Sequence, residues 1–513
     1  MALPARAERT NTRPAEPGWI ERLSASPSLA LLLMLGLIAF TSEGVLIVFM
    51  RRLSLKRFPN VLVSNEPVAQ ALGIDTRGLT WFVLVLGLLT LGYLVGYAVA
   101  LRIREPRWGL AVLAVSAVFI ATVIPIFPGG AQDVYHNIAD ARTLWVHHQD
   151  PISTPPIAHP DDPIVQQVPF WQDLTSSYGP VWYIVSGAPL PFAGNDLVEN
   201  VLGQKLLVSL FLLGTLGLVY LIVRERRPQS ATAAMVLLGW SPLILWEIPG
   251  NAHNDIVMMF FAVAAIYAIH RGAWQWAFPL LALGVGVKFI MALLGPILLV
   301  WLLWRRPRVD RRELLVSIGY GAVMLGLIYL PFFLASHSLA NTDALRNRYI
   351  SSPASLTIAF VMQYTSLSRA MDLTRALALT LYGVLYLLVL WRARGGFENL
   401  VRAAFWAILL TLAIPTWWFW PWYVIWLLPF AALTAGRKLA TIGLVFASSA
   451  LLVYPIYYWR NVLLNGPDWY ANQFVIVGAV FGPLALYLLG SSGLHLLTVE
   501  EADGPRDERR ATA

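Results

Sequence analysis

The sequence contains no cysteine, and only 13% of its 513 residues are charged. The absence of cysteine excludes disulfide bonds, thiolate metal ligands and cysteine nucleophiles. The scarcity of charge accompanies a hydrophobic fraction of 58%, which exceeds that of ordinary soluble domains. Together these proportions predict an all-α polytopic membrane protein.

The net charge of +8 has an explanation that does not involve nucleic acid. Basic residues gather in short turns between apolar runs, at 102–107, 224–227, 305–312, 392–394 and 437–438, as the positive-inside bias of membrane proteins requires. We therefore expect no nucleic-acid partner, and we expect these turns to face the cytoplasm. Residues 51–78 are an exception, because helix parity assigns this basic loop to the opposite side; either the first helix is not a simple span or this loop escapes the rule.

Apolar runs close to the roughly 20 residues that a helix needs to cross a bilayer recur along the chain. The stretch 273–304 has arginines at both ends, which predicts a hairpin that turns near Lys288. With that hairpin, the chain is expected to form a transmembrane helical bundle of about 12 to 14 spans. The other runs occupy residues 28–50, 79–101, 108–127, 202–223, 231–248, 256–270, 314–334, 376–392, 400–414, 422–436, 439–458 and 472–490.

These runs divide the chain into five regions. Residues 1–27 and 491–513 are expected to be disordered cytoplasmic tails, and residues 28–127 hold the first transmembrane helices. Residues 201–490 form the main transmembrane bundle. Between them, residues 128–200 are predicted to be a large extracytoplasmic loop with surface helices.

The 128–200 loop is predicted to carry the chemistry. Loops of this length are usually functional or disordered, and its tryptophans argue against disorder. Arg142 is its one basic residue, whereas its acidic residues are Asp133, Asp140, Asp150, Asp161, Asp162, Asp173, Asp196 and Glu199. Within this acidic set, Asp161 and Asp162 are interpreted as part of a solvated stretch rather than as a cation site.

Asp133 is the candidate catalytic residue. It follows the third apolar run, where a carboxylate held among aromatic residues could act as a general base. Asp140 would share a helical face with it, and Tyr135 and His136 are neighbouring candidates for contacts with a sugar or an acceptor. The alternative is that Asp133 only caps a helix in a solvated loop.

Three further groups of polar residues are expected at the same face of the membrane. Lys288 is isolated among apolar residues, and it either binds an anion such as phosphate or extends to the interface. Arg346 and Arg348 form a basic pair that contacts either a donor phosphate or phospholipid headgroups. A polar turn, for which helix capping is the alternative to binding, contains Glu247, His253, Asn254 and Asp255.

A carboxylate base combined with several separate cations suits a lipid-linked phosphate donor. The cations would hold the anionic leaving group while the carboxylate takes the proton of an acceptor hydroxyl. The stretch around Asp133 has no second acid at metal-ligand spacing, so we expect neither a metal nor another cofactor.

Several short motifs follow one another in a fixed order between about residues 130 and 430. They are Asp133-Val134-Tyr135, Gln149-Asp150-Pro151, Trp171, Tyr178-Gly179-Pro180-Val181-Trp182, Gly250-Asn251-Ala252-His253-Asn254-Asp255, Val287-Lys288-Phe289 and Pro421-Trp422-Tyr423. This ordered set resembles the GT-C glycosyltransferases, integral-membrane enzymes that use polyprenyl-phosphate sugars. Within that superfamily the chain is most similar to the α-(1→6)-mannopyranosyltransferases of lipomannan synthesis.

The resemblance implies inverting transfer of a hexose, mannose by likeness, from a polyprenyl-phosphate donor. The implied acceptor is a glycolipid or cell-envelope glycan, and the implied place is the extracytoplasmic face of the cell membrane, where lipids are the other partners. Asp133 matches the catalytic acid of the first outer loop. His253, Asp255 and Lys288 match positions that line the donor site, and Tyr178 belongs to a further matching motif.

Two questions remain open at this point. A lipid-linked glycan flippase or other transporter is the alternative function, although transporters usually place ionisable groups near the midplane and in related halves. The second question concerns a tryptophan cluster that forms either an interfacial belt or a surface that stacks on sugars. This cluster consists of Trp417, Trp418, Trp420 and Trp422.

Overall fold

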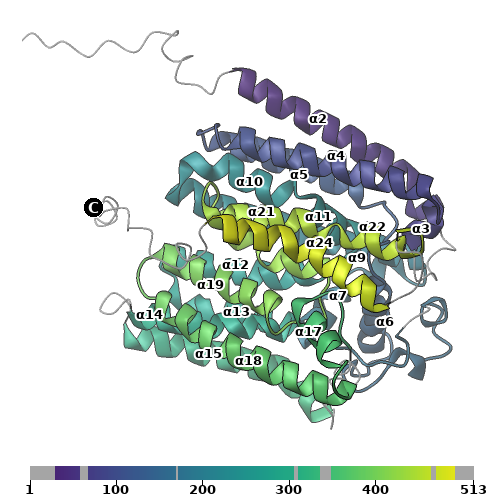
Figure 1. The fold of residues 1–513 in the computed structure, drawn as a ribbon. Coiled ribbons are helices and arrows are strands. Elements are labelled where there is room, and N and C mark those ends of the chain that lie inside the picture. Colours follow the sequence, from purple (N-terminus) through teal and green to yellow (C-terminus); the bar gives the residue numbers. More distant parts are fainter. Residues whose placement is uncertain are drawn as a thin grey trace, which may run out of the picture.

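The computed structural model describes residues 29–57, 67–168, 171–304, 310–335, 348–463 and 469–491. Within these ranges there is no strand, only isolated bridges between Ser54 and Ile126 and between Ile350 and Trp418. Long helices lie side by side in one bundle (Figure 1). The prediction of an all-α polytopic membrane protein is confirmed.

Among the described residues, seven helices are long and apolar enough to cross a membrane, or eight if the bent pair Pro228–Gly239 and Pro242–Gly250 is one span. Five more apolar helices have only 10–17 residues. The number of spans therefore stays a prediction. The long elements are α2 (Leu29–Arg52), α4 (Thr76–Ala100), α9 (Leu197–Arg226), α15 (Arg311–Ala335), α18 (Leu367–Arg392), α21 (Lys438–Ala450) with α22 (Val453–Tyr458), and α24 (Trp469–Gly490).

Shorter helices complete the bundle and cover one end of it. Those within the bundle are α5 (Arg107–Val123), α10 (Ala231–Gly239), α11 (Pro242–Leu245), α12 (Asp255–His270), α13 (Ala277–Val287), α14 (Leu294–Trp304), α19 (Phe397–Ala413) and α20 (Leu428–Leu433). The remaining short helices are α3 (Pro67–Leu72), α6 (Asp133–Trp145), α7 (Pro180–Ser186), α8 (Leu190–Ala193), α17 (Pro353–Val361) and α23 (Arg460–Leu463). In Figure 1, α3, α6, α17 and α22 lie toward the right-hand end of the bundle, and we call this end the site end.

The predicted hairpin over 273–304 is present. Helix α13 ends before Lys288, whose extended backbone breaks the helical path, and α14 returns along the bundle. The rings of Trp274 and Trp301 lie 6.0 Å apart, so the two ends of the stretch meet. At the turn, the Gly179 amide donates to the Val287 carbonyl at 3.0 Å, which joins the hairpin to the segment before α7.

The basic segment 51–57 lies at the site end, and the side of the membrane that it faces stays a prediction. The Phe127 amide donates to the Leu53 carbonyl at 2.7 Å, and the Leu55 amide donates to the Pro125 carbonyl at 2.8 Å. Lys205 of α9 is fully buried beside this pairing, where its ammonium donates to the carbonyls of Ile124 and Ile126. This lysine satisfies carbonyl groups that the end of α5 leaves without helical partners.

The arginine-bearing turns gather at the other end of the bundle. The Tyr220 hydroxyl donates to the Pro106 carbonyl at 3.2 Å, which joins the turn after α4 to the end of α9. Glu225 pairs with His270 at 2.9 Å and with Arg271 at 3.3 Å, which adds the end of α12. These contacts gather the turn after α4 and the ends of α9 and α12 away from the site end, although the site end also holds Arg51, Arg52 and Arg57. The side of the membrane that each end faces stays a prediction.

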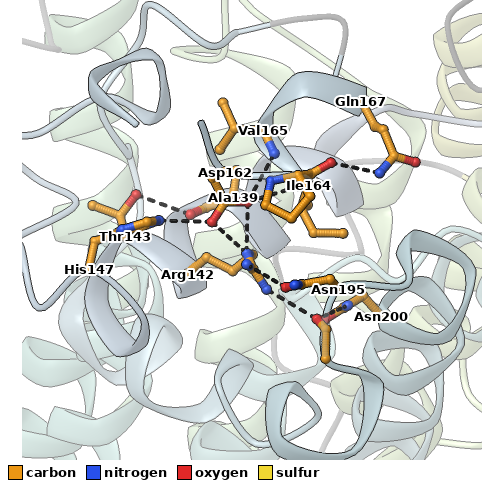
Figure 2. A network of polar contacts seen from close by, with 12 residues as sticks. Ala139, Arg142, Thr143, His147, Asp162, Ile164, Val165, Gln167, Asn195 and Asn200 are labelled. Atoms are coloured by element: carbon orange, nitrogen blue, oxygen red, sulfur yellow. Dashed lines mark hydrogen bonds and ion pairs between the residues drawn. The ribbon is translucent and has the colours of Figure 1, made fainter. Parts of the chain in front are cut away.

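The part of the 128–200 segment that the structure describes is folded around a buried ion pair, which Figure 2 shows. The Arg142 Nε donates to both Asp162 carboxylate oxygens at 3.0 and 2.9 Å, and its other nitrogens donate to the Gly194 carbonyl and the Asn195 side chain. His147 Nε2 lies 2.8 Å from Asp162 as well. These contacts join α6 to residues 162–168 and to the turn before α9.

The interpretation of Asp162 as a solvated residue is wrong. Its side chain is 1% exposed, because Arg142 and His147 satisfy its charge and the amides of Ile164 and Val165 also donate to it. Its neighbour Asp161 is exposed, as expected. Neighbouring acids in one loop can thus have opposite environments, since only one of them meets a buried arginine.

Candidate functional site

Asp133 is the first residue of α6, and close packing fixes the chain that leads to it. The Gly130 amide donates to the Asn251 side-chain oxygen at 2.7 Å. A Cβ atom on Gly130 would lie 2.2 Å from the Asn251 nitrogen, so a side chain has no room there. A carboxylate in the first turn of a helix is also stabilised by the exposed N–H groups. Sequence and packing together therefore fix Asp133 at the start of the helix.

The Asp133 carboxylate is 30% exposed and has two polar neighbours. The Tyr178 hydroxyl donates to its Oδ2 at 3.2 Å, and His253 Nε2 lies 4.0 Å from the same oxygen. Burial and the nearby carboxylates of Asp133 and Asp255 raise the pKa of Tyr178 well above its usual value. Tyr178 thus stays protonated and donates to Asp133 across the physiological range.

His253 is held by groups behind it. Its Nδ1 lies 3.1 Å from the Glu247 carboxylate, and its ring stacks on Trp422 with centroids 4.1 Å apart. Burial opposes the charged form, but the hydrogen bond and proximity to Glu247, with Asp133 and Asp255 nearby, outweigh it and raise the pKa of His253. The contact with Glu247 assigns a proton to Nδ1, and Nε2 then faces Asp133.

Glu247 is fully buried and acts as the anchor of this group. Its carboxylate accepts hydrogen bonds from the Tyr454 hydroxyl and from Asn251 Nδ2, the latter at 3.2 Å, in addition to the contact with His253. The residue lies in a π-helical turn, Trp246–Gly250, that contains Pro249. Such turns often occur at functional sites because they redirect side chains away from the regular helical positions.

Lys288 and Asp255 form the second charged group of the site. The ammonium lies 2.8 Å from each carboxylate oxygen, and the Trp426 indole N–H donates to Asp255 at 2.5 Å. The ammonium is also 5.0 Å from the centre of the Tyr178 ring. An ammonium has three N–H donors. Asp255 therefore leaves one donor of Lys288 for a ligand.

A cavity of about 550 Å³ connects these groups at the site end. Its volume lies within the range of small-molecule binding sites, roughly 300–1,000 Å³. Asp133, His136 and Lys288 form its charged side. Its aromatic side consists of Trp171, Trp417, Trp418, Trp420, Trp422, Tyr423, Trp426, Tyr454, Tyr457 and Tyr458.

The structure brings most of the predicted site residues together, in two layers. The residues that line the cavity are Asp133, His136, Tyr178 and Lys288. Behind that lining, in contact with it, lie Glu247, His253 and Asp255. The residues of the second layer contact the side chains of the lining and do not themselves line the cavity.

Three other predicted residues are buried outside the cavity lining. They are Tyr135, Asp140 and Asn254. Asp140 lies 3.5 Å from His136 Nε2, and burial raises the pKa of its carboxyl group, against the opposing effects of His136 and Ser176. Through His136, Asp140 is one contact away from the cavity.

The predicted arginine pair is described only in part. Arg346 lies outside the described residues. The Arg348 guanidinium lies 4.3 Å from the centre of the Trp171 ring and 5.7 Å from that of Trp418. The structure thus places Arg348 beside cavity-lining indoles, where its contacts are cation–π interactions.

The tryptophan cluster at 417–422 lines the cavity, which favours the ligand-stacking alternative over a simple interfacial belt. An interfacial belt and a cavity wall have the same amino-acid composition, so the sequence alone could not distinguish them.

Among the described residues, no group of three or more His, Asp or Glu side chains could hold a metal ion. Independence from metal stays a prediction.

Comparison with known proteins identifies the family. The family model described as the N-terminal domain of α-(1→6)-mannopyranosyltransferase matches residues 30–305. α-(1→6)-Mannopyranosyltransferase A of Mycobacterium tuberculosis is 24% identical over 363 residues, which cover 66% of this chain and 68% of that protein. α-(1→6)-Mannopyranosyltransferase B of Corynebacterium glutamicum is 23% identical over 175 residues, which cover 32% of this chain and 29% of that protein. Because the matched region spans more than half of the 513 residues and holds both charged groups of the cavity, the chain belongs to the α-(1→6)-mannopyranosyltransferase family.

Proposed function

We propose that the protein transfers a mannosyl residue from a polyprenyl-phosphate donor to a glycan acceptor, with inversion at the anomeric carbon. The observation that carries this proposal is the meeting of Asp133 and Lys288 in one cavity, with Tyr178 between them. One group can take a proton and the other can hold an anion. Glycosyl transfer from a phosphate leaving group needs both.

Asp133 is the proposed general base. It is the one carboxylate among the described residues that line the cavity. The acceptor hydroxyl gives its proton to Asp133 as its oxygen bonds to the anomeric carbon. Tyr178 and His253 orient the carboxylate and stabilise its charge before the transfer, and Glu247 holds His253 in place.

Lys288 is the proposed site of the donor phosphate. The bond between the anomeric carbon and the phosphate oxygen breaks, and the polyprenyl phosphate leaves with the electron pair. The free N–H of Lys288 stabilises the negative charge that develops on that oxygen. Asp255 keeps the ammonium in position, since two of its three donors are directed to that carboxylate.

The sugar and the stereochemistry of the proposal come from the relatives. Both are named for α-(1→6)-mannopyranosyl transfer. A single displacement inverts the anomeric centre, so a β-linked donor gives the α-linked product. The position of the cavity, at the end of the bundle away from the arginine turns, supports reaction at the extracytoplasmic face.

The test is transfer of labelled mannose from polyprenyl-phosphate-mannose to lipid acceptors in membranes that contain the wild type or Asp133→Asn. We expect the substitution to reduce transfer at least 100-fold, because general base catalysis contributes about 10² to 10⁴. Donor binding should persist. Asp161→Asn is the matched control, since Asp161 is an exposed acid of the same segment.

Two results would contradict the proposal. Equal transfer by the wild type and Asp133→Asn would exclude Asp133 as the base. Movement of the labelled lipid across the membrane without sugar transfer, unaffected by the substitution, would favour the transport alternative.

A further inference from the structure

We propose that Trp171, Trp417, Trp418, Trp420 and Tyr457, the aromatic wall of the cavity, bind the uncharged glycan acceptor by stacking on its pyranose rings. The inference rests on the proposed function and deepens it by naming the class of acceptor and the residues that select it. The donor occupies the charged side of the same cavity.

The chemistry of the wall favours a neutral saccharide. Apart from tyrosines, the ionisable groups among the described lining residues are Asp133, His136 and Lys288, and none of them belongs to the wall. The one described cation against the wall rings Trp171 and Trp418 is Arg348, which does not line the cavity. A pyranose ring has an apolar face of C–H groups and a rim of hydroxyls. Aromatic rings cover the C–H face through dispersion contacts and the hydrophobic effect. Polar groups at the edges of the aromatic rings bind the sugar hydroxyls.

The tryptophans of the wall also offer hydrogen-bond donors that have no partner among the described residues. Within the described part of the chain, the indole N–H groups of Trp171, Trp417, Trp418 and Trp420 donate to no protein group. By contrast, the indole of Trp426, deeper in the site, donates to Asp255. The four side chains of the wall are partly exposed, and a ligand that covered their N–H groups without pairing them would bind at a cost. Glycan hydroxyls would satisfy these donors, whereas a polyprenyl chain would leave them unpaired.

The rings of the wall are fixed in place before any ligand arrives. Trp420 is stacked on Trp422 with centroids 5.1 Å apart, and it meets the rings of Trp418 and Tyr457 edge to face at 6.0 and 5.8 Å. Ile350 pairs with the backbone of this segment, and its amide donates to the Trp417 carbonyl at 2.8 Å. A fixed surface loses little conformational entropy on binding.

The backbone of Trp171, which lies about 250 residues before the other tryptophans of the wall, supplies a separate observation. Its φ angle is 66°, in the left-handed region that bulky residues rarely adopt. Arg348 contacts both its ring and that of Trp418, so the arginine links Trp171 to the wall. Uncommon backbone conformations of this kind persist where the surrounding structure enforces them, and they concentrate at binding sites.

The wall leads to the proposed base. Trp418 contacts Trp420, Trp420 stacks on Trp422, and Trp422 stacks on His253, whose Nε2 lies 4.0 Å from Asp133. A glycan that lies along the wall would therefore end near the carboxylate that takes its proton. The wall would thus orient the acceptor with one end toward Asp133 as well as bind it.

The experiment measures the KM values of the two substrates separately in Trp171→Leu and Trp418→Leu. The acceptor is a short synthetic α-mannoside glycolipid, and the donor is polyprenyl-phosphate-mannose. We expect the KM for the acceptor to rise about tenfold, a change that corresponds to ~1.4 kcal/mol, while the KM for the donor stays within twofold. Trp171→Tyr and Trp418→Tyr should retain most of the affinity, because they keep an aromatic ring.

Trp391→Leu is the matched control. Trp391 lies near the end of α18 and is 58% exposed, outside the cavity lining. Its loss should leave both KM values unchanged. Intrinsic fluorescence melting identifies any variant that does not fold, in which case the tyrosine variants provide the comparison at the same positions.

The outcomes distinguish a failure of the wall assignment from a failure of the proposed function. An unchanged acceptor KM in folded leucine variants that still transfer mannose would overturn the wall assignment. A raised donor KM would also overturn it and assign the wall to the polyprenyl chain. If the wild type transfers no sugar, binding of the same mannoside to wild type and leucine variants, followed by quenching of tryptophan fluorescence, still tests the wall. Equal binding to all of them would refute it.

Discussion

Replacing Lys288 with methionine would leave Asp255 as an unpaired charge at a position with no exposed side-chain area. Removing one member of a buried ion pair typically costs about 3–5 kcal/mol, because the remaining ion keeps its desolvation penalty without its partner. The Trp426 N–H would still donate to Asp255. We therefore expect Lys288→Met to destabilise the protein by about 3 kcal/mol, at the lower end of that range.

The reciprocal substitution should cost less. In Asp255→Asn, the amide keeps much of the shape of the carboxylate, and Lys288, which lines the cavity with 13% of its side chain exposed, can turn toward water. We expect a loss of about 1 kcal/mol. The double variant Lys288→Met/Asp255→Asn should also lose about 1 kcal/mol of unfolding free energy, since neither a buried carboxylate nor an ammonium is then left without its partner. The two positions are therefore coupled by roughly 3 kcal/mol.

Reversible unfolding in mixed micelles of detergent and sodium dodecyl sulfate measures these free energies. Labelled-sugar transfer, measured in parallel, separates stability from function. The double variant should be more stable than Lys288→Met and yet inactive, because it lacks the cation proposed to hold the phosphate. Additive losses in the double variant, or a Lys288→Met protein as stable as the wild type, would refute the pairing.

Three further perturbations test other contacts of the site. Glu247→Gln should lower kcat about tenfold or more and shift the pH profile of transfer, with the acceptor KM little changed, because it acts through His253. Gly130→Ala should lower the free energy of unfolding by about 1–3 kcal/mol, because its Cβ would collide with Asn251; an unchanged unfolding midpoint would contradict this packing. His147 and Arg142 outweigh burial and lower the folded-state pKa of Asp162, so its contribution to stability is present above the unfolded pKa and is lost as pH falls through the folded pKa. Melting temperatures between pH 6 and pH 3 should show this loss in the wild type, and a loss of equal size in Asp162→Asn would argue against it.

The sequence predicts well the features that local patterns determine. Apolar runs located the long helices, and the flanking arginines required the hairpin that exposes Lys288. The motifs around Asp133 and His253 identified residues that the fold brings together from three parts of the chain. These successes share a cause, since membrane insertion imposes length and charge rules that are visible in a linear sequence.

The sequence does not show which polar residue faces the cavity and which lies behind it. Asp255 and Asp133 are both acids beside helix ends, but only Asp255 meets a lysine and an indole N–H from distant segments. Asp162 is buried for the same reason, because Arg142 lies within reach. Such pairings depend on long-range packing, and periodicity carries no information about them.

The two sides of the cavity come from different lengths of chain. The residues proposed to handle protons and phosphate, Asp133, His253 and Lys288, lie within residues 30–305, whereas three tryptophans of the cavity lining come from 417–420. Under the proposed assignment, most of the surface that selects the acceptor is encoded apart from the reacting groups, and Trp171 is the exception within residues 30–305. Exchange of residues 417–420 alone between members of the family would then alter the acceptor and keep Trp422, Trp426 and Tyr454, which contact His253, Asp255 and Glu247.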